Sequence, residues 1–270
     1  MKTICLAFAL TLSSVAYAQE PQQPFEPRSG QAGKDVVWVP SPPAMVNKML
    51  EVAKVTPNDF VMDLGSGDGR NIIAAAKLGA RGVGVEYNPD MVVLSRKLAA
   101  EAGVADKAQF VEGDMYAADI SKANVLALFL LPVNLNRLAP KFLEMTPGSR
   151  IVGNTFGIDG WEPDERLTLE PESDCSSWCE VLLWIVPAKA QGQWQMANGM
   201  MELFQTYQMV EGSITVDGTK HTISNRSLRG DELTFLAGGF TYQGKISGNE
   251  ITGTITTPSG QLPWRAGRQQ

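Results

Sequence analysis

The fold of this chain is decided by the stretch Val61-Met62-Asp63-Leu64-Gly65-Ser66-Gly67-Asp68-Gly69-Arg70. A short apolar run ends at an acidic residue, glycines follow at alternate positions, and residues 71–78 carry apolar side chains at helical spacing. This pattern predicts a strand, a glycine-rich turn and a helix. Glycine suits the turn because it adopts positive φ and lets a ligand approach the backbone closely. The start of the helix offers free N–H groups to that ligand.

A second strand is predicted at 82–85, and it ends in Glu86, about seventeen residues after Gly69. A carboxylate at the tip of the second strand can accept hydrogen bonds from both hydroxyls of a ribose. The two strand ends therefore indicate a nucleotide-type ligand.

Strands and helices continue to alternate along the chain. Ser41 is the expected N-cap of a helix that runs to residue 53, and a further helix is expected from Pro89 to about residue 102. Strands are expected at 107–111, 123–130 and 150–154, and a helix at 134–143. The segments 166–170 and 180–186 then form two strands with no helix between them. The pattern predicts a Rossmann-like α/β fold, a doubly wound seven-strand sheet with one antiparallel strand near an edge.

The composition changes near residue 191, because residues 191–270 hold 12 of the 26 glycines together with many threonines and serines. Short alternating strands and hairpin turns at 217–218 and 247–249 predict an antiparallel all-β domain, a small curved sheet or barrel. We therefore expect a flexible leader at 19–34, an α/β domain at 35–190 and a β domain at 191–270.

Residues 1–18 have the features of a secretory signal peptide, with Lys2, an apolar core and a small-x-small end at residues 16–18. The expected location is periplasmic or secreted, with no transmembrane segment once the signal is removed. Two cysteines, Cys175 and Cys179, then remain, and their spacing makes them a candidate disulfide. Two free thiols are the alternative.

The charge pattern argues against a nucleic-acid ligand, and the positions of the histidine and the cysteines argue against a metal site. The formal net charge is -6, and no cluster of Lys or Arg with interleaved aromatic residues stands out. The single histidine, His221, is far in sequence from the cysteine pair, so no metal ligand set is predicted.

The stretch from Asp63 to Gly69 reads Asp-x-Gly-x-Gly-x-Gly, and Arg70 stands where the third glycine of a dinucleotide-binding turn would fall. With Glu86 and Asp114 at the ends of the next two strands, residues 35–187 resemble the class I S-adenosylmethionine-dependent methyltransferases. The resemblance implies S-adenosylmethionine as cofactor. It places Asp63 near the methionine part, Glu86 on the ribose hydroxyls and Asp114 on the adenine amino group. The other implied cofactor-binding residues are Gly65, Ser66, Gly67, Gly69, Tyr87, which could pack on the adenine, and Met115.

Within that family, Trp38-Val39-Pro40-Ser41 and the glycine turn resemble the seven-strand protein-lysine methyltransferases that modify mitochondrial membrane proteins. The resemblance makes Trp38 and Pro40 candidates for a lid over the cofactor, although Trp38 could equally be a core residue. It places the methyl acceptor at Phe129, Leu131 and Pro132. No general base is evident there, so the catalytic residues stay unassigned.

The sequence thus predicts an enzyme that methylates protein lysine or, as an alternative, a small molecule. A non-catalytic exported protein that binds S-adenosylmethionine or another nucleoside is the second hypothesis. A nicotinamide-dependent oxidoreductase is disfavoured by the glycine spacing.

Overall fold

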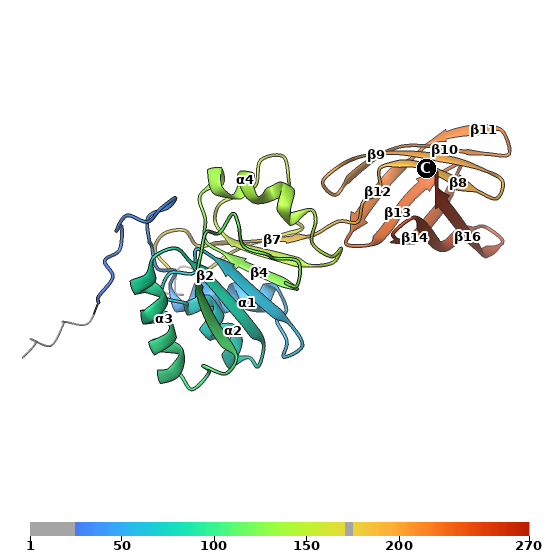
Figure 1. Cartoon of the computed structure of the whole chain (residues 1–270). Helices are drawn as coiled ribbons and strands as arrows, with labels where there is room; N and C mark the ends of the chain where they lie inside the picture. Colours follow the sequence, from blue (N-terminus) through green and yellow to red (C-terminus); the bar gives the residue numbers. More distant parts are fainter. Residues whose placement is uncertain (1–24, 171–174, 270) are drawn as a thin grey trace, which may run out of the picture.

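The computed structural model describes residues 25–170 and 175–269. They form two domains, an α/β domain and an antiparallel β domain (Figure 1). The predicted signal peptide at 1–18 and the first part of the leader lie outside the described residues. Among the residues described, no helix is long and apolar enough to cross a membrane.

The α/β domain is built on one seven-stranded sheet with the order β3-β2-β1-β4-β5-β7-β6. Strands β1 to β5 are parallel, and β7 runs antiparallel to both β5 and β6. The predicted fold class is therefore confirmed, including the antiparallel strand next to the edge. The strand bounds are β1 (Phe60–Leu64), β2 (Arg81–Glu86), β3 (Ala108–Glu112), β4 (Val125–Leu128), β5 (Arg150–Asn154), β6 (Glu165–Thr168) and β7 (Glu180–Ile185).

Helices cover both faces of this sheet. The first three helices pack on one face, where Met49, Ile72 and Val92 belong to one buried cluster, and the fourth packs on the other, where Leu138 belongs to a second cluster. In Figure 1, α4 lies above the sheet and α1 and α2 lie below it. The helix bounds are α1 (Pro43–Val52), α2 (Arg70–Lys77), α3 (Pro89–Glu101) and α4 (Pro132–Phe142).

The expected N-cap role of Ser41 is not what the structure shows. Helix α1 begins one residue later, with Pro42 at the N-cap and no side-chain cap. The Ser41 hydroxyl instead accepts a hydrogen bond from the amide of Asn154, 3.2 Å away at the end of β5. Ser41 therefore ties the start of α1 to the sheet.

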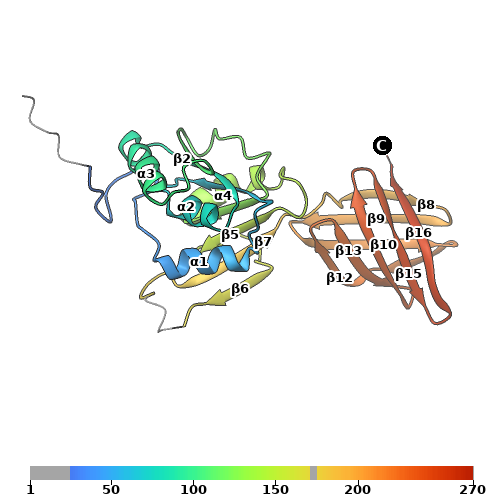
Figure 2. The same cartoon turned by 90° about the horizontal axis from the view of Figure 1, so that it is seen from below.

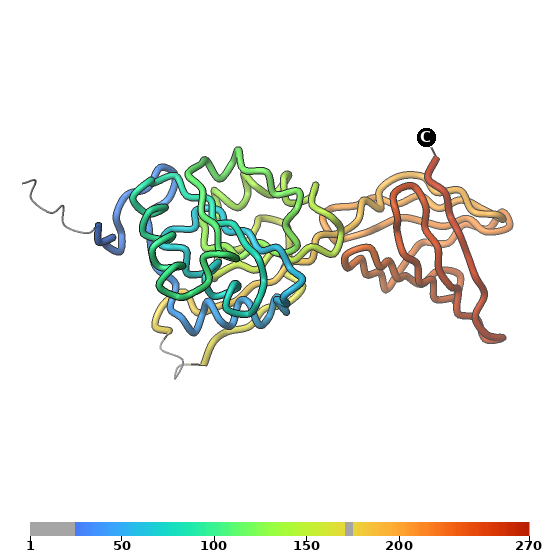
Figure 3. The backbone as a smooth tube through the Cα atoms, turned by 60° about the horizontal axis from the view of Figure 1, so that its bottom comes forward, coloured from blue at the N-terminus to red at the C-terminus, as the bar shows by residue number. Residues whose placement is uncertain are grey.

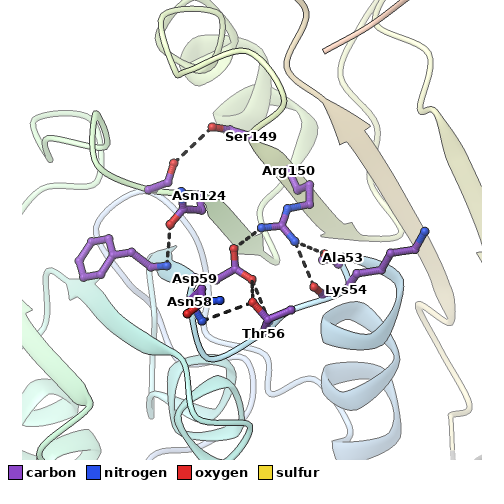
Figure 4. Close-up of polar contacts among 10 residues, drawn as sticks. Ala53, Lys54, Thr56, Asn58, Asp59, Asn124, Ser149 and Arg150 are labelled. Atoms are coloured by element: carbon purple, nitrogen blue, oxygen red, sulfur yellow. Dashed lines mark hydrogen bonds and ion pairs between the residues drawn. The ribbon is translucent and has the colours of Figure 1, made fainter. Parts of the chain in front are cut away.

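A polar network joins α1 to the edge of the sheet where the parallel strands begin (Figure 4). The Arg150 guanidinium pairs with Asp59 and donates to the carbonyl of Ala53 at 2.7 Å. The Asp59 carboxylate also accepts from the backbone N–H of Thr56 at 2.8 Å. Both members of the pair are largely buried, so this network fixes the entry of β1 against β5 and α1.

The second domain is a nine-stranded antiparallel sheet in the order β11-β10-β9-β8-β16-β15-β14-β13-β12. The two outer strands, β11 and β12, are consecutive in sequence. Ile223 lies between them, and its N–H donates a hydrogen bond to the carbonyl of Gly212 on β10. The sheet therefore curls back toward itself. Trp194, Phe235 and Trp264 fill its interior. The predicted antiparallel β domain is confirmed. Its strands are β8 (Gly192–Met196), β9 (Gly199–Thr206), β10 (Met209–Val216), β11 (Thr219–Thr222), β12 (Ser224–Arg229), β13 (Glu232–Ala237), β14 (Phe240–Ser247), β15 (Glu250–Thr257) and β16 (Gly260–Arg268).

The two domains meet where the segment after β7 passes into β8 (Figure 3). The rings of Trp161 and Tyr207 stack with centroids 4.9 Å apart, and Arg229 pairs with Glu165 at 2.9 Å. In Figure 1 and Figure 2 the β domain and the described residues before α1 lie at opposite ends of the α/β domain. The β domain therefore stands away from the edge that the leader covers.

Candidate functional site

The glycine-rich turn after β1 has the predicted backbone. Gly65, Gly67 and Gly69 have φ values of 77°, 55° and 81°. A Cβ on Gly67 would lie 2.5 Å from the indole nitrogen of Trp38, so only glycine leaves room for that ring. Gly69 faces elsewhere, because a Cβ there would lie 2.4 Å from the ring of Phe110. Gly69 thus lets α2 approach the sheet and does not line the cavity described next.

A cavity of about 220 Å³ opens beside this turn. Its lining comes from the carboxyl ends of the parallel strands and from the residues before α1. The predicted residues that it brings together are Trp38, Pro40, Asp63, Gly65, Ser66, Gly67, Glu86, Tyr87, Asp114, Met115, Phe129 and Leu131. All lining residues lie between Gln31 and Trp178, so the cavity belongs to the α/β domain. Ligands bind at this edge of open α/β sheets as a rule.

Asp63 is the buried acid of the cavity. Its carboxylate accepts a hydrogen bond from the amide of Asn71 at 3.0 Å. Burial raises the pKa of Asp63 to about 8, and the charges of Glu86 and Asp68 act in the same direction. No basic side chain in the described part of the chain pairs with it. The site therefore has a carboxylate that favours a cationic ligand group.

Glu86 is held in place by the backbone around it. One carboxylate oxygen accepts from the N–H of Gly67 and the other from the N–H of Asn88, both at 2.9 Å. Each oxygen retains a further lone pair, so the carboxylate is oriented and still able to accept hydrogen bonds from a diol.

Asp114 lies on a different side of the cavity, where it meets the leader. Its Oδ1 accepts a hydrogen bond from the N–H of Tyr116 at 2.9 Å, and its Oδ2 accepts one from the ammonium of Lys34 at 2.6 Å. The same ammonium lies 5.0 Å from the centre of the Tyr87 ring. The hydrogen bond from Lys34 lowers the pKa of Asp114 below its ordinary value.

Residues 31–41, here called the lid segment, border the cavity along their whole length. A bridge between Gln31 and Trp38 folds this segment into a hairpin-like turn. The leader, expected to be flexible over 19–34, is therefore attached to the α/β domain from Gln31 onward. The contact of Lys34 with Asp114 could not be foreseen from a segment rich in Pro, Gln and Gly.

The ends of β4, β5 and β7 give the cavity an aromatic side. Phe129 and Leu131 line it as predicted, whereas Pro132 does not, because it opens helix α4 instead. Sequence reasoning missed two residues of this side, Phe156 and Trp178. Phe156 comes two residues after β5, so the rule that strand ends carry function could have found it. Trp178 precedes β7, and only the antiparallel direction of that strand brings it to the same edge.

The predicted cysteine pair and two tryptophans lie outside the acidic part of the cavity. The structure joins Cys175 and Cys179 by a disulfide with Cα atoms 5.7 Å apart. Trp184 and Trp194 are fully buried and pack in the cores of the α/β domain and the β domain. Among the described residues, no group of three or more His, Cys, Asp or Glu side chains could hold a metal ion.

The residues of the cavity fit S-adenosylmethionine. The buried Asp63 suits a cationic methionine end, and the open turn at Gly65 and Gly67 leaves space next to the backbone. Glu86 is oriented for a ribose, and Tyr87 with Asp114 borders the position expected for an adenine. The acids that line the cavity lie at or just after the ends of β1, β2 and β3 or in the lid segment. The ends of β4, β5 and β7 contribute apolar and aromatic side chains.

Comparisons with known proteins agree with this arrangement. Residues 63–165 match the model of the ANTKMT methyltransferase domain family. The chain is 43% identical over 139 residues to a protein-lysine N-methyltransferase of Saccharolobus islandicus, across 50% of this chain and 86% of that protein. It is 32% identical over 130 residues to the mouse adenine nucleotide translocase lysine N-methyltransferase, across 47% of this chain and 56% of that protein.

A solved structure is similar as well. It is an RNA methyltransferase from Salinibacter ruber in complex with S-adenosyl-L-homocysteine, with a TM-score of 0.52 and 44% identity. The match covers 56% of this chain and 95% of that one. These matches cover about half of the present chain, so its other half has no counterpart in them.

Proposed function

Because the chain belongs to the class I S-adenosylmethionine-dependent methyltransferases, in the lysine methyltransferase branch, we propose that its acceptor is the side-chain amine of a protein lysine. The observation that carries this proposal is the division of the cavity, with acids on the side of β1 to β3 and aromatic side chains at the ends of β4, β5 and β7. The first side suits the cofactor, and the second suits a long apolar side chain that ends in an amine.

When bound, the cofactor supplies a methyl group activated by a positively charged sulfur. The residues of the chain align this group with the acceptor nitrogen and exclude water from the contact. The apolar surroundings of Phe129 and Leu131 disfavour a charged amine and so lower its pKa, which allows the nitrogen to release its proton to water before it attacks. Asp63, Glu86 and Asp114 would hold the cofactor, which would supply the methyl group for transfer to the nitrogen.

RNA is the second acceptor to consider, since the similar Salinibacter ruber protein is described as an RNA methyltransferase. The charge of this chain argues against it. The formal net charge is -6, whereas RNA-binding surfaces are basic. Protein lysine is therefore the acceptor that we favour, and RNA is an outcome that the experiment must distinguish.

We also propose that the protein is exported, to the periplasm or outside the cell. Two features support this. Residues 1–18 read as a signal peptide, and a disulfide is typical of oxidising compartments. Cell fractionation with N-terminal sequencing tests the proposal. A chain that starts at Gln19 in the exported fraction supports it, and a cytosolic chain that keeps Met1 contradicts it.

The cofactor is tested first, by isothermal titration of the purified protein with S-adenosylmethionine and S-adenosylhomocysteine. We expect binding of both and a loss of at least tenfold in affinity for Asp63→Ala, whose side chain is buried in the cavity. A protein that is folded and binds neither compound would contradict the assignment of the cofactor.

The acceptor is tested with tritium-labelled S-adenosylmethionine and extracts of the cell envelope and the cytosol. Label that survives nuclease, disappears with protease and is recovered as methylated lysine supports the proposal. Label that is removed by ribonuclease would identify RNA as the acceptor instead. Label in a fraction of low molecular mass would identify a small molecule.

A further inference from the structure

Three aromatic rings meet at the acceptor side of the cavity, and each comes from the end of a different strand. Phe129 follows β4, Phe156 follows β5 and Trp178 precedes β7. The rings of Phe129 and Phe156 are stacked, with centroids 6.0 Å apart and planes 9° apart. The ring of Trp178 lies 6.0 Å from Phe129 at 57° to it. The three rings therefore form one cluster that borders the cavity.

Trp178 is the unusual member of this cluster. Its side chain is 45% exposed, although a tryptophan gains most by burial. Its φ is 56°, a left-handed conformation that costs a bulky residue free energy and that persists only where the surroundings impose it. The fold therefore holds Trp178 at the cavity wall in a backbone conformation that a free loop would not favour.

A covalent link constrains the backbone around Trp178. Trp178 lies inside the short loop that the disulfide between Cys175 and Cys179 closes. The loop is fastened at its end as well, because the carbonyl of Cys179 accepts from the N–H of Leu169 at 2.8 Å. Next to it, Thr155 and Glu180 exchange hydrogen bonds that join the end of β5 to the start of β7. The disulfide thus leaves Trp178 little freedom to leave the cavity wall.

The chemistry of the cluster matches an alkylammonium group. Aromatic faces attract a cation, and several rings around one cation are the usual way to bind methylated amines. The acids that line the cavity are on the other strands or in the lid segment, so the three rings offer apolar contact and π-faces. A lysine chain could lie along them, both as a free amine and after it has gained methyl groups.

We propose that Phe129, Phe156 and Trp178 form the subsite that binds a lysine-type alkylamine and its methylated forms, and that the Cys175–Cys179 disulfide positions Trp178 in it. The inference rests on the proposed function and adds to it the residues that recognise the acceptor. In this arrangement Trp178 contacts the acceptor, and the two cysteines are positioning residues.

The test uses the full chain saturated with S-adenosylhomocysteine and a probe of defined chemistry, Nα-acetyl-Nε-trimethyllysine amide. The uncharged control probe is Nα-acetylnorleucine amide. Binding is followed by NMR of the ¹⁵N-labelled tryptophan indoles, which also reports weak complexes. We expect the trimethylated probe to shift the indole signal of Trp178 and to bind at least threefold more tightly than the norleucine probe.

The variants separate the roles. We expect Trp178→Ala to weaken binding of the trimethylated probe about tenfold and Trp178→Phe to retain part of it, with the affinity for S-adenosylhomocysteine changed less than twofold. The double variant Cys175→Ser/Cys179→Ser should weaken probe binding about threefold or more. Phe204→Ala, an exposed aromatic on the β domain, is the matched control and should change neither affinity.

Reduction with dithiothreitol gives a second test. It should weaken probe binding by the wild-type chain and have no effect on Trp178→Ala, because the ring that the disulfide positions is then absent. Equal probe binding by wild type and Trp178→Ala, or no preference for the trimethylated probe, would overturn the inference while leaving the methyltransferase assignment intact. Failure to bind S-adenosylhomocysteine at all would instead reject the proposed function and this inference with it.

Discussion

The ammonium nitrogen of Lys34 lies 2.6 Å from Oδ2 of Asp114, and the two residues are 80 positions apart in the chain. The contact fastens the lid segment to the end of β3, beside the ring of Tyr87. It is exposed to solvent, so salt weakens it. Its acidic partner has a lowered pKa, so the ion pair is present at neutral pH and is lost as pH falls through that lowered pKa.

Removal of this contact should loosen the lid segment. We expect Lys34→Ala to weaken binding of S-adenosylhomocysteine roughly two- to fivefold, because an exposed ion pair contributes little on its own. Hydrogen exchange of residues 31–38 should become faster in this variant. Lys48→Ala, which breaks an exposed pair on α1, is the control and should leave both readouts unchanged. Unchanged exchange in Lys34→Ala would show that the contact does not hold the segment.

Gly67 should not tolerate a side chain. Gly67→Ala places a Cβ 2.5 Å from the Trp38 indole at a φ of 55°, so it combines backbone strain with a displaced ring. We expect at least a tenfold loss of cofactor affinity. Gly103→Ala is the matched control, because Gly103 has a φ of 70° and open space around it. It should cost about 1 kcal/mol of unfolding free energy and leave cofactor affinity intact. Equal cofactor affinity in the two variants would contradict the role given to Trp38.

The buried Asp63 predicts a dependence on pH. Its pKa is raised from 3.8 to about 8 in the ligand-free fold, so the folded state holds a proton that the unfolded state loses. The free energy of unfolding should therefore fall as pH rises from about 4 to about 8, by about 1.4 kcal/mol per pH unit at most. Asp63→Asn lacks this group and should show a flatter profile in denaturant titrations.

The same group predicts proton release on cofactor binding. A cationic ligand next to Asp63 favours the ionised carboxylate, so affinity for S-adenosylhomocysteine should rise between pH 6 and pH 8. Calorimetry at pH 7 in buffers of different ionisation enthalpy should detect the released proton. Asp63→Asn should release none, and release that persists in this variant would assign the proton to another group.

Arg150 should contribute to the free energy of unfolding and have no part in cofactor binding. Arg150→Met leaves the carboxylate of Asp59, which is 9% exposed, without its cation, and we expect a loss of about 2 to 4 kcal/mol in urea unfolding. Arg166→Met breaks a more exposed pair with Glu180 and should cost less than about 1 kcal/mol. The folded Arg150→Met variant should keep its affinity for S-adenosylhomocysteine. A similar cost for both variants would mean that the network in Figure 4 adds little.

Much of the fold could be predicted from the sequence because its signals are local. The apolar run before Gly65, the glycines and the helix former after them are neighbours in the chain, and β4 is apolar at every position because both of its faces are buried. The acids at the ends of β1 and β2 could be predicted because each directly ends a short apolar run in the sequence. The start of helix α1 could not be predicted in this way, since Ser41 accepts a hydrogen bond from Asn154 at the end of β5 and does not cap the helix.

The class of fold and the acidic strand ends could be predicted from short stretches of the chain, and the cofactor followed from the resemblance of those stretches to a known family. Which side chains meet across the cavity depends on how the strands are arranged in space. Lys34 reaches Asp114, Trp38 covers Gly67, and Trp178 joins Phe129 because β7 runs antiparallel to its neighbours. Each of these contacts joins residues far apart in the chain, and no local pattern of residues encodes which of them meet.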